Sequence, residues 1–287
     1  MKKILEIDPQ YIEKIWGGDF FSDILKNKKI GECILFSANL NVRECFEKNK
    51  KRQKKVKEII ENKKNILGEK IYNEILSLEI KIIDANENLS IQVHPKNKDE
   101  MWYVLKNKKN AYIYLELRNG VDKEMLKKED ILNKLKIYKV KKEDCIYIPG
   151  GVVHSLGKGI RVLEIKEKGK TYRLFDFDRG RTLEKKNGIK ELLVEEKGII
   201  QKKKRDGLIG VIGIWEIYKI NFTGTKKFLL SEKVCIFVFI EGQGIIECSD
   251  EKKEYYAGKL YLIFAENEII NIQGSGKIIM LFNKGKK

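Results

Sequence analysis

The sequence predicts a mainly β protein with a helical region in its N-terminal half. Two observations support this fold class. Short runs rich in β-branched and aromatic residues, bounded by Gly, Asn or Pro, recur from about residue 78 to the C-terminus. One earlier stretch, rich in lysine, instead has apolar residues at helical spacing. Many short strands joined by small turns are typical of β-barrels and β-sandwiches.

The N-terminal part is predicted to be mixed. A short helix is expected from about Asp19 to Lys29, and Gly31–Ala38 is predicted to be a strand. From about Glu47 to Leu76 the apolar positions recur as on one face of a helix, which predicts an amphipathic helical region. A glycine at position 68 is expected to divide it into two helices.

The middle of the chain is predicted to be mostly strands. The expected strands are Leu78–Ile83, Leu89–His94, Met101–Leu105, Tyr112–Leu117, Cys145–Ile148 and Arg161–Lys166. Lys123–Leu135 between them has the pattern of a helical insert.

The C-terminal part has a denser strand pattern. Its expected strands are Trp215–Phe222, Val234–Ile240, Gly244–Cys248, Lys259–Phe264, Ile269–Ile272 and Lys277–Phe282. The basic stretch Lys202–Gly207 is predicted to link two β units, so we expect one domain over residues 1–201 and another over 208–287.

Composition excludes several classes of protein. Hydrophobic residues make up 42% of the 287-residue chain and charged residues 35%, which is incompatible with global disorder. No apolar run reaches the roughly 18 residues that a membrane span needs, and residues 1–10 do not resemble a signal peptide, so a cytoplasmic protein is expected. The five cysteines include no CxxC pair and are expected to be reduced and packed as small apolar residues.

The net charge of +17 raises the question of nucleic-acid binding. The excess is almost all lysine and is spread along the chain, and the densest basic runs contain no aromatic residues for base stacking. We therefore expect no specific nucleic-acid partner and no membrane partner, but weak binding to polyanions at low salt.

A candidate metal site lies around the only two histidines of the chain. Gln92 and His94 are two residues apart on a predicted strand, so their side chains point to the same side. Glu100 follows after a turn, and a strand–turn–strand passage can bring it back beside His94. His154 follows a tight Pro-Gly-Gly turn and can face this group across a barrel.

Two neutral imidazoles, one carboxylate and one amide oxygen form a ligand set that suits Zn²⁺ and leaves room for a substrate. Because the set contains no thiolate, it is typical of a catalytic site rather than a structural one. The alternative is that each histidine is an ordinary core or surface side chain.

The quoted segments together resemble the type I mannose-6-phosphate isomerases, in their shorter bacterial form. The resemblance spans about residues 4–195 in the family's order. It is carried by IWGG (15–18), GEC (31–33), KIIDA (81–85), LSIQVHP (89–95), EMWYVL (100–105), IPGGVVHSLGKG (148–159), TYR (171–173) and DFDRGR (176–181).

The resemblance implies a fold and a set of site residues. It implies two cupin-type (jelly-roll) β-barrels, of which the C-terminal one, without histidine, binds no metal. Gln92, His94, Glu100 and His154 are implied to hold one Zn²⁺ per chain.

The other site residues implied by the resemblance are substrate-binding or catalytic. Arg173 resembles the family's active-site arginine, Ser90 and Lys98 match polar residues of its substrate pocket, and Glu164 matches a pocket-lining acid. Asp176 and Asp178 are expected to form structural ion pairs with Arg179 or Arg181.

The implied activity is the interconversion of mannose 6-phosphate and fructose 6-phosphate through an enediol, with a sugar phosphate as the small-molecule partner. A sugar-phosphate-binding cupin without catalysis is the alternative. The sequence leaves open whether Glu164, a metal-bound water or Lys98 is the general base, and whether Arg173 holds phosphate or stabilises the enediolate. It also leaves open the oligomeric state, the physiological direction and the strictness for mannose.

Overall fold

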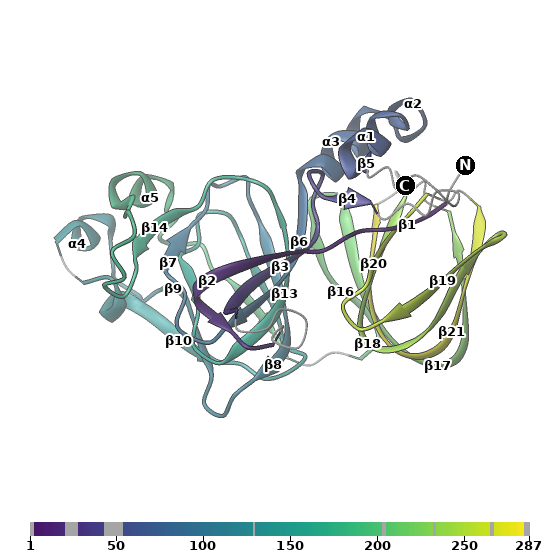
Figure 1. Cartoon of the computed structure of the whole chain (residues 1–287). Helices are drawn as coiled ribbons and strands as arrows, with labels where there is room; N and C mark the ends of the chain where they lie inside the picture. The colour runs from purple at the N-terminus through teal and green to yellow at the C-terminus, as the bar shows by residue number, and fades with distance from the viewer. Residues whose placement is uncertain are drawn as a thin grey trace. The chain divides into compact units, whose positions relative to one another are not determined.

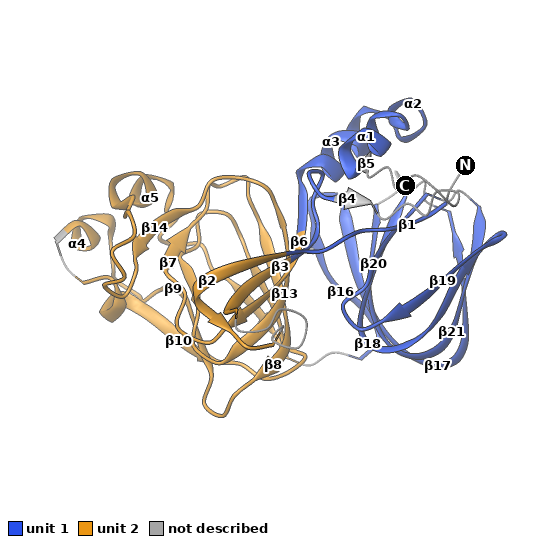
Figure 2. Ribbon diagram, in the orientation of Figure 1, with its two compact units in different colours: residues 1–10, 34–79, 204–287 blue, residues 11–33, 80–203 orange. Residues whose placement is uncertain are grey.

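The computed structural model of the chain describes residues 3–20, 28–42, 54–128, 130–202, 205–231, 234–264 and 267–283. The chain forms two compact units (Figure 2), and neither is continuous in sequence. Unit 1 comprises residues 1–10, 34–79 and 204–287, and unit 2 comprises residues 11–33 and 80–203. The predicted domains 1–201 and 208–287 stay a prediction, because a compact unit is not by itself an independently folding domain.

Two sheets carry most of unit 2 (Figure 1). A seven-stranded sheet has the order β15-β11-β8-β13-β6-β2-β3, and a five-stranded sheet has the order β10-β9-β12-β7-β14. The strands of the larger sheet are β2 (Gln10–Gly18), β3 (Ile30–Phe36), β6 (Leu78–Ala85), β8 (Glu100–Asn107), β11 (Cys145–Ile148), β13 (Ile160–Glu167) and β15 (Ile199–Gln201). Those of the smaller sheet are β7 (Ile91–Val93), β9 (Tyr112–Leu117), β10 (Leu135–Lys139), β12 (His154–Leu156) and β14 (Tyr172–Phe175).

The alternation of side chains along β7 determines which way Gln92 faces. Ile91 and Val93 are fully buried in an apolar cluster that includes Leu174 and Ile189. Successive side chains of a strand point to opposite faces, so Gln92 faces away from this cluster. A second apolar cluster contains residues of both sheets. Trp102 and Val162 belong to the larger sheet, and Ile113 and Leu156 belong to the smaller one.

Two short helices pack against the smaller sheet of unit 2. They are α4 (Lys123–Lys128) and α5 (Lys185–Glu191), and Leu126 and Ile189 place them in the same apolar cluster as β7. The predicted helix Lys123–Leu135 is too long: α4 ends at Lys128, a 3-10 turn follows at Leu132–Lys134, and β10 begins at Leu135, where it pairs with β9.

Unit 1 is built on another seven-stranded sheet, of order β1-β20-β18-β21-β17-β16, with β19 paired to β18. The strands are β1 (Ile4–Glu6), β16 (Gly207–Ile212), β17 (Trp215–Leu230), β18 (Cys235–Cys248), β19 (Glu251–Tyr256), β20 (Leu260–Ile263) and β21 (Glu268–Asn283). The sequence divides β18 and β21 into two runs each. The ladder runs through these glycine-containing breaks, with one register shift between Phe239 and Glu241, because glycine weakens a strand without ending its hydrogen bonding.

The predicted helical region also belongs to unit 1. It contains α1 (Val56–Glu61), α2 (Lys64–Leu67) and α3 (Glu69–Ser77), after a two-stranded pairing of β4 (Asn41–Val42) with β5 (Lys54–Lys55). Gly68 separates α2 from α3 with φ +83°, which confirms the predicted break. Residues 47–53 of the predicted helical stretch and residues 21–27 of the predicted N-terminal helix lie outside the described residues.

Two predictions from composition can be compared with the described residues. No helix among them is long and apolar enough to cross a bilayer. Cys33, Cys145, Cys235 and Cys248 are buried, as expected for thiols packed in the core, and burial raises the pKa of Cys33 to about 12. Cys45 lies outside the described residues.

Candidate active site

A row of three side chains crosses the smaller sheet of unit 2. In the ladder His154 of β12 lies opposite Gln92 of β7, and Gln92 lies opposite Arg173 of β14. Side chains directly opposite each other on antiparallel strands share one face of the sheet. The three strands thus place two predicted metal ligands and the predicted active-site arginine side by side, although 62 residues separate Gln92 from His154.

A second row crosses the larger sheet. Glu100 of β8 lies opposite Lys166 of β13, and Trp102 lies opposite Glu164. Because residues two apart on a strand share a face, all four side chains lie on the same side of this sheet. Glu100, Trp102 and Glu164 are almost completely buried.

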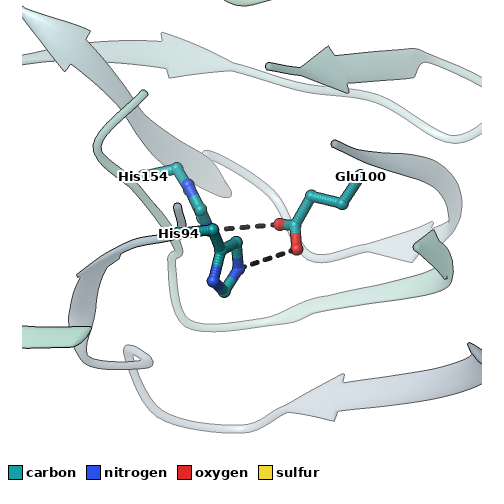
Figure 3. A group of neighbouring side chains, drawn as sticks. All are labelled: His94, Glu100 and His154. Carbon is teal, nitrogen blue, oxygen red and sulfur yellow. Dashed lines mark hydrogen bonds and ion pairs between the residues drawn. The ribbon is translucent and has the colours of Figure 1, made fainter. Parts of the chain in front are cut away.

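The two rows meet at a buried cluster of His94, Glu100 and His154 (Figure 3). Nε2 of His94 is 3.0 Å from Oε2 of Glu100, and Nε2 of His154 is 3.1 Å from Oε1 of the same carboxylate. The ring centroids of the two histidines are 4.9 Å apart. The amide nitrogen of Gln92 is 3.1 Å from Nε2 of His154, so the fourth predicted ligand belongs to the same group.

A backbone carbonyl lies beside Nδ1 of each histidine. Nδ1 of His154 donates to the carbonyl of Val152 at 2.9 Å, which leaves a lone pair on its Nε2. Nδ1 of His94 lies 3.1 Å from the carbonyl of Lys170 and 3.1 Å from the ammonium nitrogen of Lys98. Nε2 of each ring points at Glu100. Holding a histidine through its second nitrogen in this way is the usual arrangement around a bound metal.

The cluster is buried, and burial changes the pKa values of its groups. Burial lowers the pKa of His94 to about 4, so its neutral form prevails at neutral pH. Burial alone would raise the pKa of Glu100, but the two histidines hold it well below its usual value. Both oxygens of the Glu100 carboxylate lie beside an imidazole nitrogen. An ionised carboxylate and two imidazoles therefore meet in a buried space.

This donor set fits a metal ion. Imidazole nitrogens and carboxylate or amide oxygens suit Zn²⁺ without any thiolate. A half-turn of the Gln92 amide about its last bond exchanges its nitrogen for its oxygen, which is the atom able to bind a cation. This buried group is the only metal-binding cluster found among the described residues of the chain.

Lys98 approaches the cluster from the loop between β7 and β8. Its ammonium nitrogen is 3.1 Å from Nδ1 of His94, donates to the carbonyl of Gly169 at 3.3 Å and to the hydroxyl of Thr171 at 3.3 Å. Burial, followed by the nearby charge of Lys166, lowers the pKa of Lys98 to about 8.

Glu164 lies between two lysines next to the cluster. Its Oε2 is 2.9 Å from Nζ of Lys166 and 3.1 Å from Nζ of Lys81, and its Oε1 accepts from the indole of Trp102 at 3.3 Å. Burial alone would raise its pKa, but Lys166 and Lys81 bring the pKa of Glu164 to about 2. The carboxylate is therefore ionised throughout the neutral range.

The two other predicted substrate-binding residues differ in their surroundings. Ser90 is buried just before β7. Arg173 donates from Nη1 to the carbonyl of Thr182 at 3.0 Å, whereas its Nε is buried without a hydrogen-bond partner. Burial, and then the charge of Arg181, lowers the pKa of Arg173. An anion bound to Arg173 would give its Nε an acceptor and would raise the pKa of the guanidinium again.

The predicted ion pairs of the DFDRGR segment are only partly as expected. Asp176 is paired with both Arg179, at 2.8 Å, and Arg181. No ion pair to Asp178 is found among the described residues.

Sequence reasoning missed two basic residues of the site, Lys81 and Lys166. A signal for Lys166 was present, since it lies two residues after Glu164 on a predicted strand and so shares its face. Lys81 is in the KIIDA segment, but the pairing that brings β6 beside β13 is visible only in the sheet order.

The known proteins to which the chain is similar are named as the same kind of enzyme in each comparison. Residues 4–115 match the family model described as phosphomannose isomerase type I, catalytic domain. The chain is 28% identical over 269 residues to mannose-6-phosphate isomerase ManA of Bacillus subtilis, covering 82% of this chain and 85% of that protein. It is 31% identical over 199 residues to the mannose-6-phosphate isomerase of Streptococcus mutans, covering 62% of each.

Solved structures are similar over nearly the whole chain. The crystal structure of mannose 6-phosphate isomerase from Bacillus subtilis has a TM-score of 0.82 at 24% identity, covering 98% of this chain and 99% of that one. A zinc-bound mannose 6-phosphate isomerase has a TM-score of 0.76 at 13% identity, covering 99% and 100%. At these identities the likeness shows the fold, and it confirms the predicted mainly β architecture of cupin type.

Proposed function

The chain belongs to the type I phosphomannose isomerase family, and from this premise we propose that it interconverts mannose 6-phosphate and fructose 6-phosphate. The observation that carries the proposal is the buried cluster of His94, Glu100 and His154, in which Nε2 of each histidine lies 3.0 or 3.1 Å from the Glu100 carboxylate. The exchange moves a proton between C2 and C1 through an enediol, so negative charge develops on the sugar oxygens.

Gln92, His94, Glu100 and His154 would hold one Zn²⁺. The ion would polarise the sugar carbonyl and its neighbouring hydroxyl, and so stabilise the charge of the enediolate. Glu100 is the only anionic member of the ligand set, so the net charge of the site stays positive.

Arg173 and Lys98 are the residues we propose for contact with the substrate's anionic groups, with Ser90 as a hydrogen-bonding neighbour. A guanidinium can form two parallel hydrogen bonds to a phosphate, whereas an ammonium acts as a point charge. The unpaired Nε of Arg173 supports its role in substrate binding. A buried donor without an acceptor destabilises the protein, and a bound anion would supply that acceptor.

Of the candidate bases, Lys98 suits proton transfer better than Glu164. An efficient general base has a pKa near the working pH. The pKa of Lys98 is about 8, whereas the pKa of Glu164 is about 2, and Glu164 is already engaged by two lysines and Trp102. We propose that Glu164 positions those lysines rather than taking a proton itself.

The test is a coupled isomerase assay on purified protein, with zinc and after chelation. The fructose 6-phosphate formed is converted to glucose 6-phosphate by a coupling enzyme, and the glucose 6-phosphate is measured. We expect turnover with zinc and its loss with the chelator. His94→Ala and His154→Ala should each lower kcat by at least about 1,000-fold, because Lewis-acid stabilisation is worth several kcal/mol. Circular dichroism should show that both variants remain folded.

Two results would contradict the proposal. Normal turnover in metal-free protein would exclude the metal-assisted mechanism. Binding of mannose 6-phosphate without exchange of the C2 proton would favour the non-catalytic sugar-phosphate-binding protein instead.

We also propose that catalysis resides in the predicted domain 1–201 and that residues 208–287 carry no chemistry. The described interior of the C-terminal sheet is filled by aromatic and aliphatic side chains, such as the stacked pair Phe239 and Tyr255. A cytoplasmic location is part of the proposal, supported by the burial of four cysteines as thiols among the described residues.

A further inference from the structure

The Pro149-Gly150-Gly151 turn, which leads to His154, contacts the two other chain segments that carry proposed metal ligands. One of these segments contains His94, and the other begins β8 at Glu100. The ladder between β8 and β11 ends where Ile148 lies opposite Glu100. Beyond this point no strand pairing holds the turn beside Glu100.

The two glycines of the turn each use their N–H to bind one ligand-carrying segment. Gly151 donates to the carbonyl of His94 itself at 2.9 Å. Gly150 donates to Oδ1 of Asp99, the residue directly before Glu100, at 2.9 Å. The first of these bonds is between backbone atoms, whereas the second depends on a side chain.

A second bond orients the Asp99 carboxylate. Its Oδ2 accepts from the hydroxyl of Tyr147 on β11 at 2.5 Å. Burial, followed by this hydrogen bond, raises the pKa of Tyr147, so the phenol keeps its proton and remains a donor. Beyond the last strand pair, the carboxylate of Asp99 therefore connects the start of β8 to Tyr147 of β11 and to the turn that follows β11.

The turn is also packed against the His94 segment. A Cβ added to Gly150 would lie 2.3 Å from the carbonyl oxygen of Pro95 and 2.6 Å from that of Lys96. The close approach leaves little freedom for the turn to move toward the His94 segment, and Asp99 holds it on the side of Glu100.

We propose that Asp99 is a positioning residue that fixes the distance between Glu100 and His154 and thereby sets the affinity of the metal site. Among the described residues its carboxylate accepts hydrogen bonds from Gly150 and Tyr147, and it acts on the ligands through the turn. The proposal rests on the metal site of the proposed function. Side chains that orient metal ligands in this way typically change affinity by about 10- to 100-fold when removed.

The experiment measures zinc affinity directly, by competition with a chromophoric chelator, in wild-type protein and in three variants. Asp99→Ala removes both hydrogen bonds and should weaken zinc binding by about 10- to 100-fold. Asp99→Asn keeps an oxygen for Gly150, and its amide can donate to the Tyr147 oxygen, so it should restore affinity to within about threefold of wild type.

Asp122→Ala is the matched control. Asp122 also accepts a backbone N–H, from Met125 at 2.8 Å, and it lies in the same compact unit, but it contacts no ligand-carrying segment. Its zinc affinity should equal that of wild type. Melting temperatures in chelator, measured for all variants, separate positioning from general loss of stability: the metal-free Asp99→Ala and Asp122→Ala proteins should melt within a few degrees of each other.

Each outcome decides between the claims. Wild-type protein that binds no zinc would contradict the proposed function and the positioning role with it. Tight zinc binding by wild type and equally tight binding by Asp99→Ala would overturn only the positioning role. So would equal weakening in Asp99→Ala and Asp122→Ala, or an Asp99→Asn variant as weak as Asp99→Ala.

Discussion

At the scale of single residues, the site depends on side chains whose ordinary chemistry is changed by burial. Glu100 and Glu164 are both carboxylates in the interior of unit 2, and both stay ionised. They differ in their partners: Glu100 faces two imidazole rings, whereas Glu164 faces two ammonium groups. The charge of Glu164 is therefore compensated by two lysines, whereas Glu100 belongs to a donor set that fits a metal ion.

The ion pairs of Glu164 predict a pH-dependent loss of stability in Glu164→Gln. The pKa of Glu164 falls from 4.5 to about 2 on folding, so ionisation stabilises the fold above pH 4.5, and this contribution is lost as the pH falls toward 2. At pH 7 we expect the variant to be less stable by about 3 kcal/mol.

Urea unfolding at a series of pH values checks this prediction. The difference between wild type and Glu164→Gln should shrink as the pH falls from about 4.5 toward 2. A difference that does not change with pH would show that packing, and not charge, holds Glu164.

At the scale of structural elements, glycines at turns determine how closely the segments of the site approach. Gly150 has no room for a Cβ because of the backbone of Pro95 and Lys96. Gly120, in contrast, has open space around it but a φ of +78°, which disfavours any residue with a Cβ. Glycine is required at position 150 because a Cβ would clash, and it is favoured at position 120 because of the backbone conformation.

Gly150→Ala should destabilise the protein and weaken metal binding together. The added Cβ must move the turn away from the His94 segment, and overpacking of this kind costs about 1–3 kcal/mol. Gly120→Ala should cost about 1 kcal/mol through its backbone alone and leave zinc affinity unchanged.

Thermal unfolding and zinc titration of the two variants check this. Equal zinc affinity in Gly150→Ala and wild type would mean that the turn can shift without moving His154.

At the scale of the whole molecule, the described residues contain a single group of side chains that could hold a metal ion, in unit 2. Both histidines of the chain are in it, so no imidazole is left for a second site. The described core of the C-terminal sheet is built instead from residues such as Phe237, Tyr255 and Tyr261.

One zinc ion per chain is therefore the expected stoichiometry. Elemental analysis of protein loaded with zinc and then desalted should give a ratio near one, and a ratio near zero in His154→Ala. Because zinc binds only the folded state, saturating it should raise the melting temperature, by an amount equivalent to about 4 kcal/mol at 1,000 times Kd. A ratio of two, or an unchanged melting temperature, would contradict a single buried site.

Much of the fold could be predicted because strand patterns are local. The predicted strands Tyr112–Leu117 and Cys145–Ile148 coincide with β9 and β11, and the break at Gly68 lies between α2 and α3. Short elements with weak patterns, such as β14 and α5, were missed. They are held in place by apolar contacts with β7, which no local pattern contains.

The sequence by itself determined which donor groups the proposed chemistry can use: two histidines, the acid Glu100 and the amide Gln92, in motifs that resemble one family. It could do so because residue type and spacing along a strand specify donor atoms and the face on which they lie. Only the tertiary structure decided that Glu164 is ionised between Lys81 and Lys166, and that Asp99 ties the His154 turn to Glu100. A pKa and a hydrogen bond depend on neighbours that the folded chain brings together from distant positions, and local sequence does not contain those distances.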